Sequence, residues 1–227
     1  MSPFDNLLAI DSSTRALKLA VSFGADRLVK SEELMERSHG QVLTKKIGEL
    51  LASAGLTTRN LHGIVVSIGP GSFTGLRIGL AAAKGMAVAL HLPVVGISTF
   101  EVAAYRLSEM REPIRVLIPL KKDELFMGTV VNGACDLNQI RILTHEQVIQ
   151  ESGELHHVAI GFDLQHSLPR LRSPDGQSEL SFDAAYLLQL GRLRLEQGRP
   201  DDLTTLEPLY LQKSQAEIRF EQRNRQG

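Results

Sequence analysis

The feature that most constrains this chain is a glycine-rich stretch that also carries a helix pattern. Residues 69–85 read GPGSFTGLRIGLAAAKG, and an apolar stripe at helical spacing starts within them: Leu76, Leu80, Ala83, Ala87 and Leu90. This stripe predicts a helix that packs on a sheet of its own chain. Each glycine inside a helix costs about 1 kcal/mol relative to alanine. The glycines at 75, 79 and 85 therefore indicate a close approach, either by a phosphate or by a protein surface.

The phosphate interpretation finds no established motif in this stretch. A P-loop requires G-x-x-x-x-G-K-[ST], but Gly75 is followed by Leu76 and Arg77. The dinucleotide fingerprint G-x-G-x-x-G is absent as well, because Thr74 stands at the third glycine position. Backbone N–H groups at the start of any helix can still bind an anion. The simpler interpretation is that Ser72 is the N-cap of this helix.

The protein-surface interpretation depends on a second face of the same helix. This face is apolar, has little side-chain bulk and consists of Gly75, Gly79, Ala82, Met86 and Ala89. Charged or ionisable side chains appear only on one narrow strip, at Arg77, Lys84 and His91. A helix that is apolar nearly all round is normally buried. The second face is therefore predicted either to pack against the preceding helix of this chain, at residues 41–54, or to contact another protein.

The contact interpretation makes two further predictions. Leu43 and Ile47 of the preceding helix join the interface, and Gly79→Leu blocks docking without unfolding the chain. Because such a face would be exposed in the isolated subunit, the chain is also expected to form a homodimer through it.

Hydrophobic periodicity predicts two lobes of mixed α/β structure. The first hundred residues read β-β-β-α-β-α-β, ending with a strand at residues 94–97. After Phe100 the pattern restarts less clearly. We therefore assign residues 1–100 to a first lobe with the interface helices, residues 101–210 to a more divergent second lobe, and residues 211–227 to a tail that packs back or frays.

Composition argues against several classes of function. With 25 basic and 26 acidic residues the formal net charge is −1, which disfavours a strongly electrostatic nucleic-acid binder acting alone. The single cysteine, Cys135, forms no internal disulfide and fits a reducing compartment. Neither a secretory signal nor a run of about 20 apolar residues is visible. We therefore predict a soluble cytoplasmic protein that does not engage membranes.

Three blocks of the sequence closely resemble the TsaB (YeaZ) family: LLAIDSSTRALKLAVS, ERSHGQVLTKKIGELLASAGL and GPGSFTGLRIGLAAAKGMAVALHLPVVGIST. The resemblance covers residues 7–105 and is loose beyond residue 110, where Lys121, Lys122 and Asp123 replace the family's Asp-Ala-Arg turn. It implies the two-lobed actin-like ATPase (ribonuclease H-like) fold, with mixed sheets and a β-β-β-α-β-α core. It also implies a bacterial protein that helps to make threonylcarbamoyladenosine in tRNA.

The role implied by the resemblance is that of a non-catalytic partner. TsaD would transfer the threonylcarbamoyl group to the N6 of the adenosine beside the anticodon, while this chain binds TsaD, activates it and forms a surface for the ATPase TsaE. Contact with tRNA is expected to be indirect or weak. The two metal-binding histidines of TsaD correspond to Thr99 and Ala103 here, which cannot ligate a metal as a pair. No catalytic residue, metal or cofactor is therefore expected.

The resemblance leaves a nucleotide-dependent alternative open. In the actin-like superfamily the first hairpin, here Asp11, Ser12 and Ser13, often lies beside nucleotide phosphate, and the ordinary interpretation is a polar β-turn. A stand-alone ATPase or small-metabolite kinase would need to bind ATP. A metalloprotease, the activity after which this branch of the superfamily has been labelled, would need a bound metal.

Overall fold

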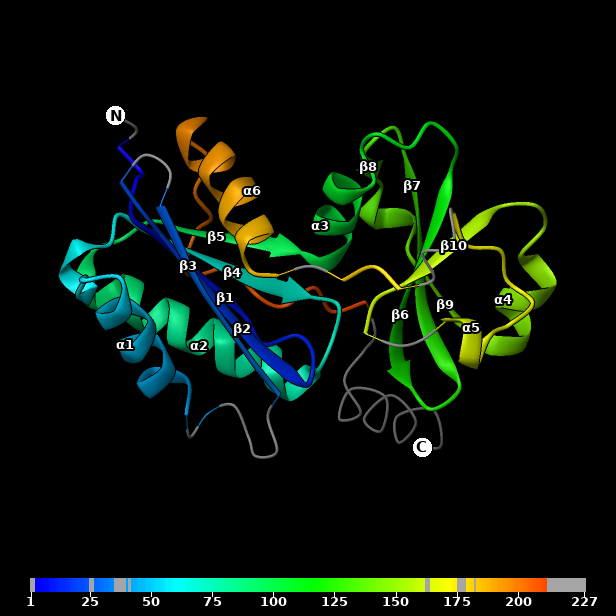
Figure 1. The fold of residues 1–227 in the computed structure, drawn as a ribbon, viewed down its shortest axis with the longest axis horizontal. Helices are drawn as coiled ribbons and strands as arrows, with labels where there is room; N and C mark the ends of the chain where they lie inside the picture. Colours follow the sequence, from blue (N-terminus) through cyan, green and yellow to red (C-terminus); the bar gives the residue numbers. More distant parts are fainter. Residues whose placement is uncertain are drawn as a thin grey trace, which may run out of the picture.

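The first half of the chain forms a five-stranded mixed sheet. The structure is a computed structural model and describes residues 3–24, 27–34, 40, 42–161, 164–174, 179–181 and 183–211. The strands are β1 (Leu7–Asp11), β2 (Ala16–Phe23), β3 (Arg27–Leu34), β4 (Gly63–Gly69) and β5 (Val94–Ser98), in the order β3-β2-β1-β4-β5 (Figure 1). The hairpins β1–β2 and β2–β3 are antiparallel, whereas β4 pairs in parallel with both β1 and β5. The predicted β-β-β-α-β-α-β order is confirmed.

Two helices cover one face of this sheet and a third helix covers the other (Figure 1). The first pair is α1 (Leu43–Ser53) and α2 (Phe73–Leu90), and the third is α6 (Ala185–Glu196). A short 3-10 turn, η2 (Thr58–Asn60), precedes β4. The Ser72 side chain accepts a hydrogen bond from the N–H of Gly75 at 3.2 Å, which confirms the predicted N-cap of α2. His91 ends α2 in the left-handed conformation.

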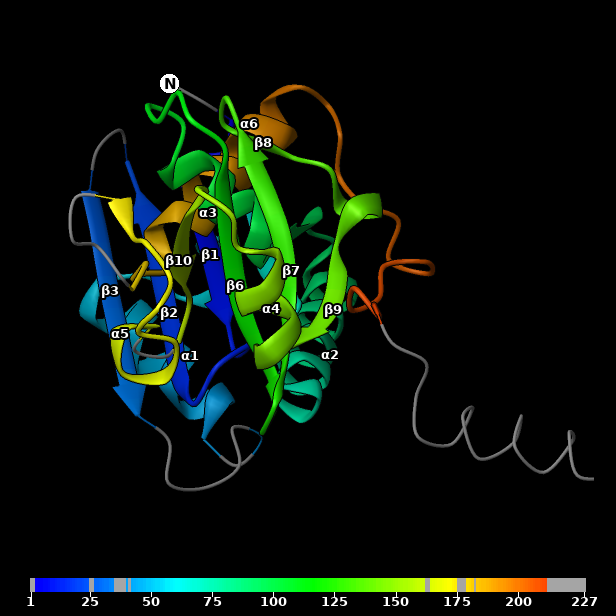
Figure 2. The same ribbon diagram turned by 90° about the vertical axis from the view of Figure 1, so that its right-hand side faces the viewer.

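The second lobe is built on a smaller sheet. Its strands are β6 (Ile114–Lys121), β7 (Glu124–Val131), β8 (Ala134–Cys135), β9 (Arg141–Thr144) and β10 (His156–Ala159), in the order β10-β6-β7-β8 with β9 also paired to β7. The accompanying helices are α3 (Thr99–Arg106), η3 (Leu137–Gln139), α4 (His145–Glu151) and α5 (Leu164–Ser167). Figure 2 views the molecule from this lobe, with α2 along one flank.

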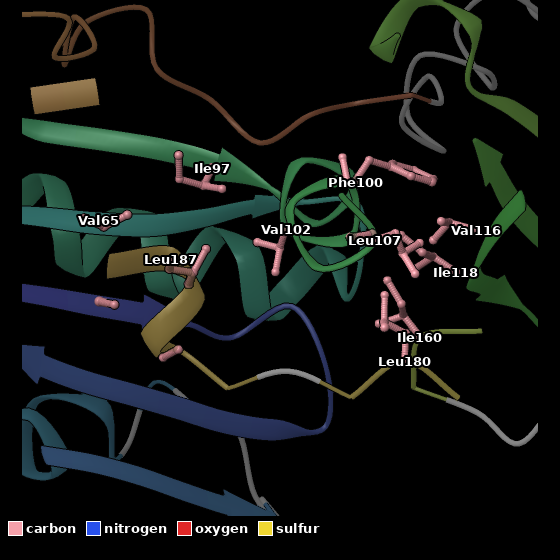
Figure 3. Packing of buried hydrophobic residues seen from close by; sticks show 14 of the residues in the cluster. Val65, Ile97, Phe100, Val102, Leu107, Val116, Ile118, Ile160, Leu180 and Leu187 are labelled. Carbon is pink, nitrogen blue, oxygen red and sulfur yellow. The ribbon is translucent and has the colours of Figure 1, made fainter. Parts of the chain in front are cut away.

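One hydrophobic cluster joins the two lobes. Helix α3 lies between the sheets and carries Phe100 and Val102, both fully buried (Figure 3). Val65 and Ile97 of the first sheet and Val116 of the second belong to the same cluster. Burial of apolar surface is worth about 25 cal/mol per Å². This shared core therefore holds the lobes in one arrangement.

The C-terminal part of the chain returns to the first sheet, which corrects the predicted lobe boundary. The sequence analysis placed residues 101–210 in the second lobe, but α6 packs against β1, β2, β4 and β5. The segment after α6 continues along this sheet: the N–H of Asp201 donates to the Val94 carbonyl and that of Leu209 to the Ile68 carbonyl, each at 2.8 Å. Residues 212–227, most of the predicted tail, lie outside the described residues.

Candidate partner-binding surface

Two glycines of α2, Gly75 and Gly79, make room for a hairpin of the same chain. The turn between β1 and β2 lies against the start of the helix. A Cβ atom built on Gly75 would overlap the Ser12 carbonyl oxygen, and one built on Gly71 would overlap that of Ser13. At Gly79 a Cβ atom would overlap the Ser12 hydroxyl. The close approach inferred from the sequence is real at Gly75 and Gly79, but its partner is internal. At Gly85 the inference was wrong, because nothing lies within 4 Å of a Cβ atom built there.

Hydrogen bonds tie this hairpin to the helix. The N–H of Ser72 donates to the Ser13 carbonyl at 2.6 Å, and the Ser12 hydroxyl donates to the Gly75 carbonyl at 2.8 Å. The N–H of Ser13 donates to the Asp11 carboxylate at 2.9 Å. Asp11, Ser12 and Ser13 are buried. Their polar groups therefore stabilise a structural turn. A nucleotide-binding hairpin would direct such a hydroxyl to phosphate, whereas the Ser12 hydroxyl is hydrogen-bonded to the Gly75 carbonyl.

Most of the predicted interface residues are not on an open surface. Gly75 and Gly79 are buried beneath the hairpin, and Leu43 and Ile47 are buried in the core between α1, α2 and the sheet. Their assignment to a partner contact was wrong, because a contact within the chain uses each of them. Ala82 and Met86 are half-buried and pack against the same core, which leaves Ala89 as the exposed member of the predicted set.

The exposed side of α2 is rotated relative to the predicted one. It carries Phe73, Arg77, Ala81, Gly85 and Val88, which we call the open face of α2. Val88 is 63% exposed, and nothing lies within 4 Å of a Cβ atom built on Gly85. The signal that could have found this face was the spacing of Arg77, Lys84 and His91, because charged side chains mark the water-facing side. The buried stripe is confirmed except for Leu90, which is half-buried.

An aromatic cluster lies at the N-terminal end of the open face. The ring centroids of Phe73 and Tyr210 are 5.7 Å apart, and the Arg77 guanidinium lies 3.9 Å from the Phe73 centroid. The Nε–H of Arg77 donates to the Tyr210 hydroxyl at 3.1 Å. Phe73 and Tyr210 are both exposed. Sequence reasoning missed Tyr210 because it placed residues near 210 in the other lobe.

The helix α2 also meets a length and composition criterion for crossing a membrane, as the single helix of the described residues that does so. This is weak evidence, since core helices of soluble proteins satisfy the same criterion. Here Leu80 and Ala83 belong to the core of the first sheet, and the Leu76 side chain lies against Gly69 of β4.

Comparison with known proteins places the chain in a family. The model of the family described as TsaD: tRNA N6-adenosine threonylcarbamoyltransferase matches residues 32–155, more than half of the chain. The chain belongs to the TsaD family. Two curated relatives match over nearly their whole length, both called tRNA threonylcarbamoyladenosine biosynthesis protein TsaB. The protein from Escherichia coli K12 is 28% identical, over 92% of this chain and 96% of its own length. The protein from Haemophilus influenzae is 27% identical, over 90% of this chain and 92% of its own length.

A solved structure supports the same relationship. YeaZ from Pseudomonas aeruginosa is 26% identical, covers 93% of this chain and all of its own, and superposes with a TM-score of 0.72. The resemblance to TsaB (YeaZ) is confirmed, and so are the mixed sheets with a β-β-β-α-β-α core that the expected fold requires. Within the TsaD family these relationships support a protein of tRNA threonylcarbamoyladenosine biosynthesis.

Thr99 and Ala103, which correspond to the two metal-binding histidines of TsaD, have structural roles in this chain. The Thr99 hydroxyl donates to the Pro70 carbonyl at 3.1 Å, and Ala103 is fully buried in the core shared by the lobes. No cluster of three or more metal-ligating side chains occurs among the described residues. Burial raises the pKa of the Cys135 thiol to about 11, so this cysteine stays protonated and weakly nucleophilic near neutral pH.

Proposed function

We propose that this chain is a non-catalytic partner subunit that binds and activates a TsaD-like threonylcarbamoyltransferase. That enzyme would transfer the threonylcarbamoyl group to the N6 of the adenosine beside the anticodon in tRNA. The assembly would also include a TsaE-like ATPase, with at most weak contact between tRNA and this chain. The hydroxyl groups of Thr99 and Ser12 donate hydrogen bonds within the chain, and Ala103 is buried in its core. These contacts favour a partner role over a stand-alone ATPase or kinase.

The open face of α2 is the observation that carries this proposal. From Phe73 to Val88 it extends along about 22 Å of helix, at 1.5 Å per residue. Its middle part is nearly flat because Ala81 and Gly85 have little or no side chain. Small side chains let a second helix approach closely, and exposed apolar patches mark interaction sites. The aromatic cluster with Arg77 adds residue types that often anchor protein interfaces.

The proposal is tested by placing a charge on the open face. Val88→Arg introduces a long cationic side chain at a position that is 63% exposed, so the fold is expected to tolerate it. We expect this variant to lose capture by a TsaD-like enzyme and to abolish the dependence of threonylcarbamoyladenosine formation on this chain. Capture is measured by pull-down, and the modified nucleoside by mass spectrometry of tRNA from a reconstituted reaction.

The matched control is Val131→Arg, which makes the same change at an exposed valine of β7 in the second lobe. This variant is expected to support modification like the wild type. Equal activity of the two variants at equal thermal stability would refute a role for the open face. Modification that proceeds equally well without this chain would refute the partner function itself.

The isolated chain is expected to self-associate through the same face. An exposed apolar helix face is partly shielded from water when a second copy covers it, and twofold dimers are the commonest closed oligomers. Sedimentation should show a dimer that dissociates on dilution, and Val88→Arg should sediment as a monomer. A wild-type chain that remains monomeric at high concentration would contradict this expectation.

A further inference from the structure

Three exposed large hydrophobic side chains surround one cavity on the side of the first sheet that α6 covers. They are Leu28, Tyr105 and Leu193, each 38–48% exposed. The cavity has a volume of about 370 Å³. Figure 1 shows α6 on the opposite side of the sheet from α1 and α2. This cavity, which we call the α6 cavity, is therefore separate from the open face of α2.

Elements far apart in the sequence build the α6 cavity. Leu28 comes from β3, Tyr105 from α3 and Leu193 from α6, while the buried Leu188 of α6 contributes to its apolar lining. The Tyr105 ring packs edge-on against Tyr186, with ring centroids 6.2 Å apart. The apolar rim is therefore held by packed strands and helices, which is the usual setting of a preformed binding site.

The charge lining the cavity has one sign. Arg27 and Arg192 both line it, and no Asp or Glu does. The Arg27 guanidinium is stacked 4.4 Å from the Phe23 ring centroid, and Arg192 donates to the Asp5 carbonyl at 3.4 Å. In the described part of the chain neither has a carboxylate within 4.0 Å. Each guanidinium has five N–H donors, so donors remain for a carboxylate.

We propose that the α6 cavity binds an acidic segment of a partner protein. The segment would place an apolar side chain between Leu28 and Leu193, and its carboxylates on Arg27 and Arg192. Charge complementarity selects this occupant, because two arginines that have no carboxylate within 4.0 Å among the described residues favour an anionic ligand. The cavity is open to solvent, whereas small-molecule sites enclose most of their ligand. A peptide that continues across the exposed rim fits this shape better.

The proposal is tested by selecting peptides on the full-length chain. A library of random short peptides displayed on phage is panned against the immobilised wild type. We expect the selected sequences to place Asp or Glu beside Leu, Ile or Phe. Synthetic copies should bind more weakly as salt is raised. Arg27→Glu should weaken their binding about tenfold or more, since it replaces an attractive charge with a repulsive one.

Two further variants separate the contributions of charge and apolar contact. Leu193→Ser removes an exposed apolar side chain from the rim of the cavity and should also weaken peptide binding. Arg59→Glu makes the same charge change as Arg27→Glu, but on η2 and outside the cavity, and should leave peptide binding unchanged. Thermal unfolding of each variant checks that the fold is retained. Selection of no peptides, selection of peptides without acidic residues, or unchanged binding to Arg27→Glu would overturn the proposal. None of these outcomes bears on the open face of α2.

Discussion

Gly75→Ala is expected to lower the free energy of unfolding by about 2–3 kcal/mol, although alanine is the better helix former by about 1 kcal/mol. The new methyl group would overlap the Ser12 carbonyl oxygen, which is backbone and cannot rotate away. The hairpin cannot retreat freely, because Ser72 and Ser13 are hydrogen-bonded across the same contact. Either that bond breaks or α2 moves off the first sheet. Urea unfolding followed by circular dichroism measures the difference.

Gly85→Ala is the matched control within the same helix. Gly85 is exposed, and nothing lies within 4 Å of its built Cβ atom. The same substitution should therefore raise the free energy of unfolding by up to about 1 kcal/mol through helix propensity alone. Opposite signs at the two positions would establish that the hairpin, and not the helix, requires glycine at 75. Stabilisation by Gly75→Ala would contradict the close contact between Gly75 and the Ser12 carbonyl.

The order of the elements could be predicted from the sequence because it depends on local periodicity. Leu17, Leu19 and Val21 alternate along β2 and share the face that α1 and α2 cover. The stripe of Leu76, Leu80 and Ala83 shows which side of α2 is buried. The same stripe shows that α2 packs on its own sheet. These features need no knowledge of what lies elsewhere in the chain.

The partner of each glycine could not be predicted in this way. Gly75 meets Ser12, a residue 63 positions earlier, and a sequence pattern does not show which distant segment fills a gap. For the same reason Gly79→Leu is a poor test of docking, because its side chain would collide with the Ser12 hydroxyl and disturb the fold. The return of α6 to the first sheet was missed because a helix pattern does not specify which of two lobes it covers.

The free energy of unfolding is expected to fall by about 3 kcal/mol between pH 7 and pH 4 through His157 alone. His157 on β10 is fully buried, and burial lowers its pKa from 6.5 to about 4, with the charges of Arg115 and His156 acting in the same direction. Nearby backbone carbonyls of Leu155 and Arg172 oppose the shift without cancelling it. Between these two pKa values His157 binds a proton in the unfolded chain but stays neutral in the folded chain. Lowering the pH in this range therefore favours unfolding.

Replacing the imidazole should remove this part of the pH dependence. His157→Asn cannot titrate in this range, so its stability should change less with pH than that of the wild type, whatever constant offset the substitution adds. The control is His156→Asn at the adjacent residue, whose side chain is part-exposed and lies 3.5 Å from Glu112. That variant should keep the steep dependence, because adjacent side chains on a strand face opposite sides and His157 stays buried. Urea midpoints between pH 4.5 and 7.5 give the comparison. Parallel curves for wild type and His157→Asn would mean that the folded chain protonates His157 as readily as the unfolded chain does, which burial beside Arg115 should prevent.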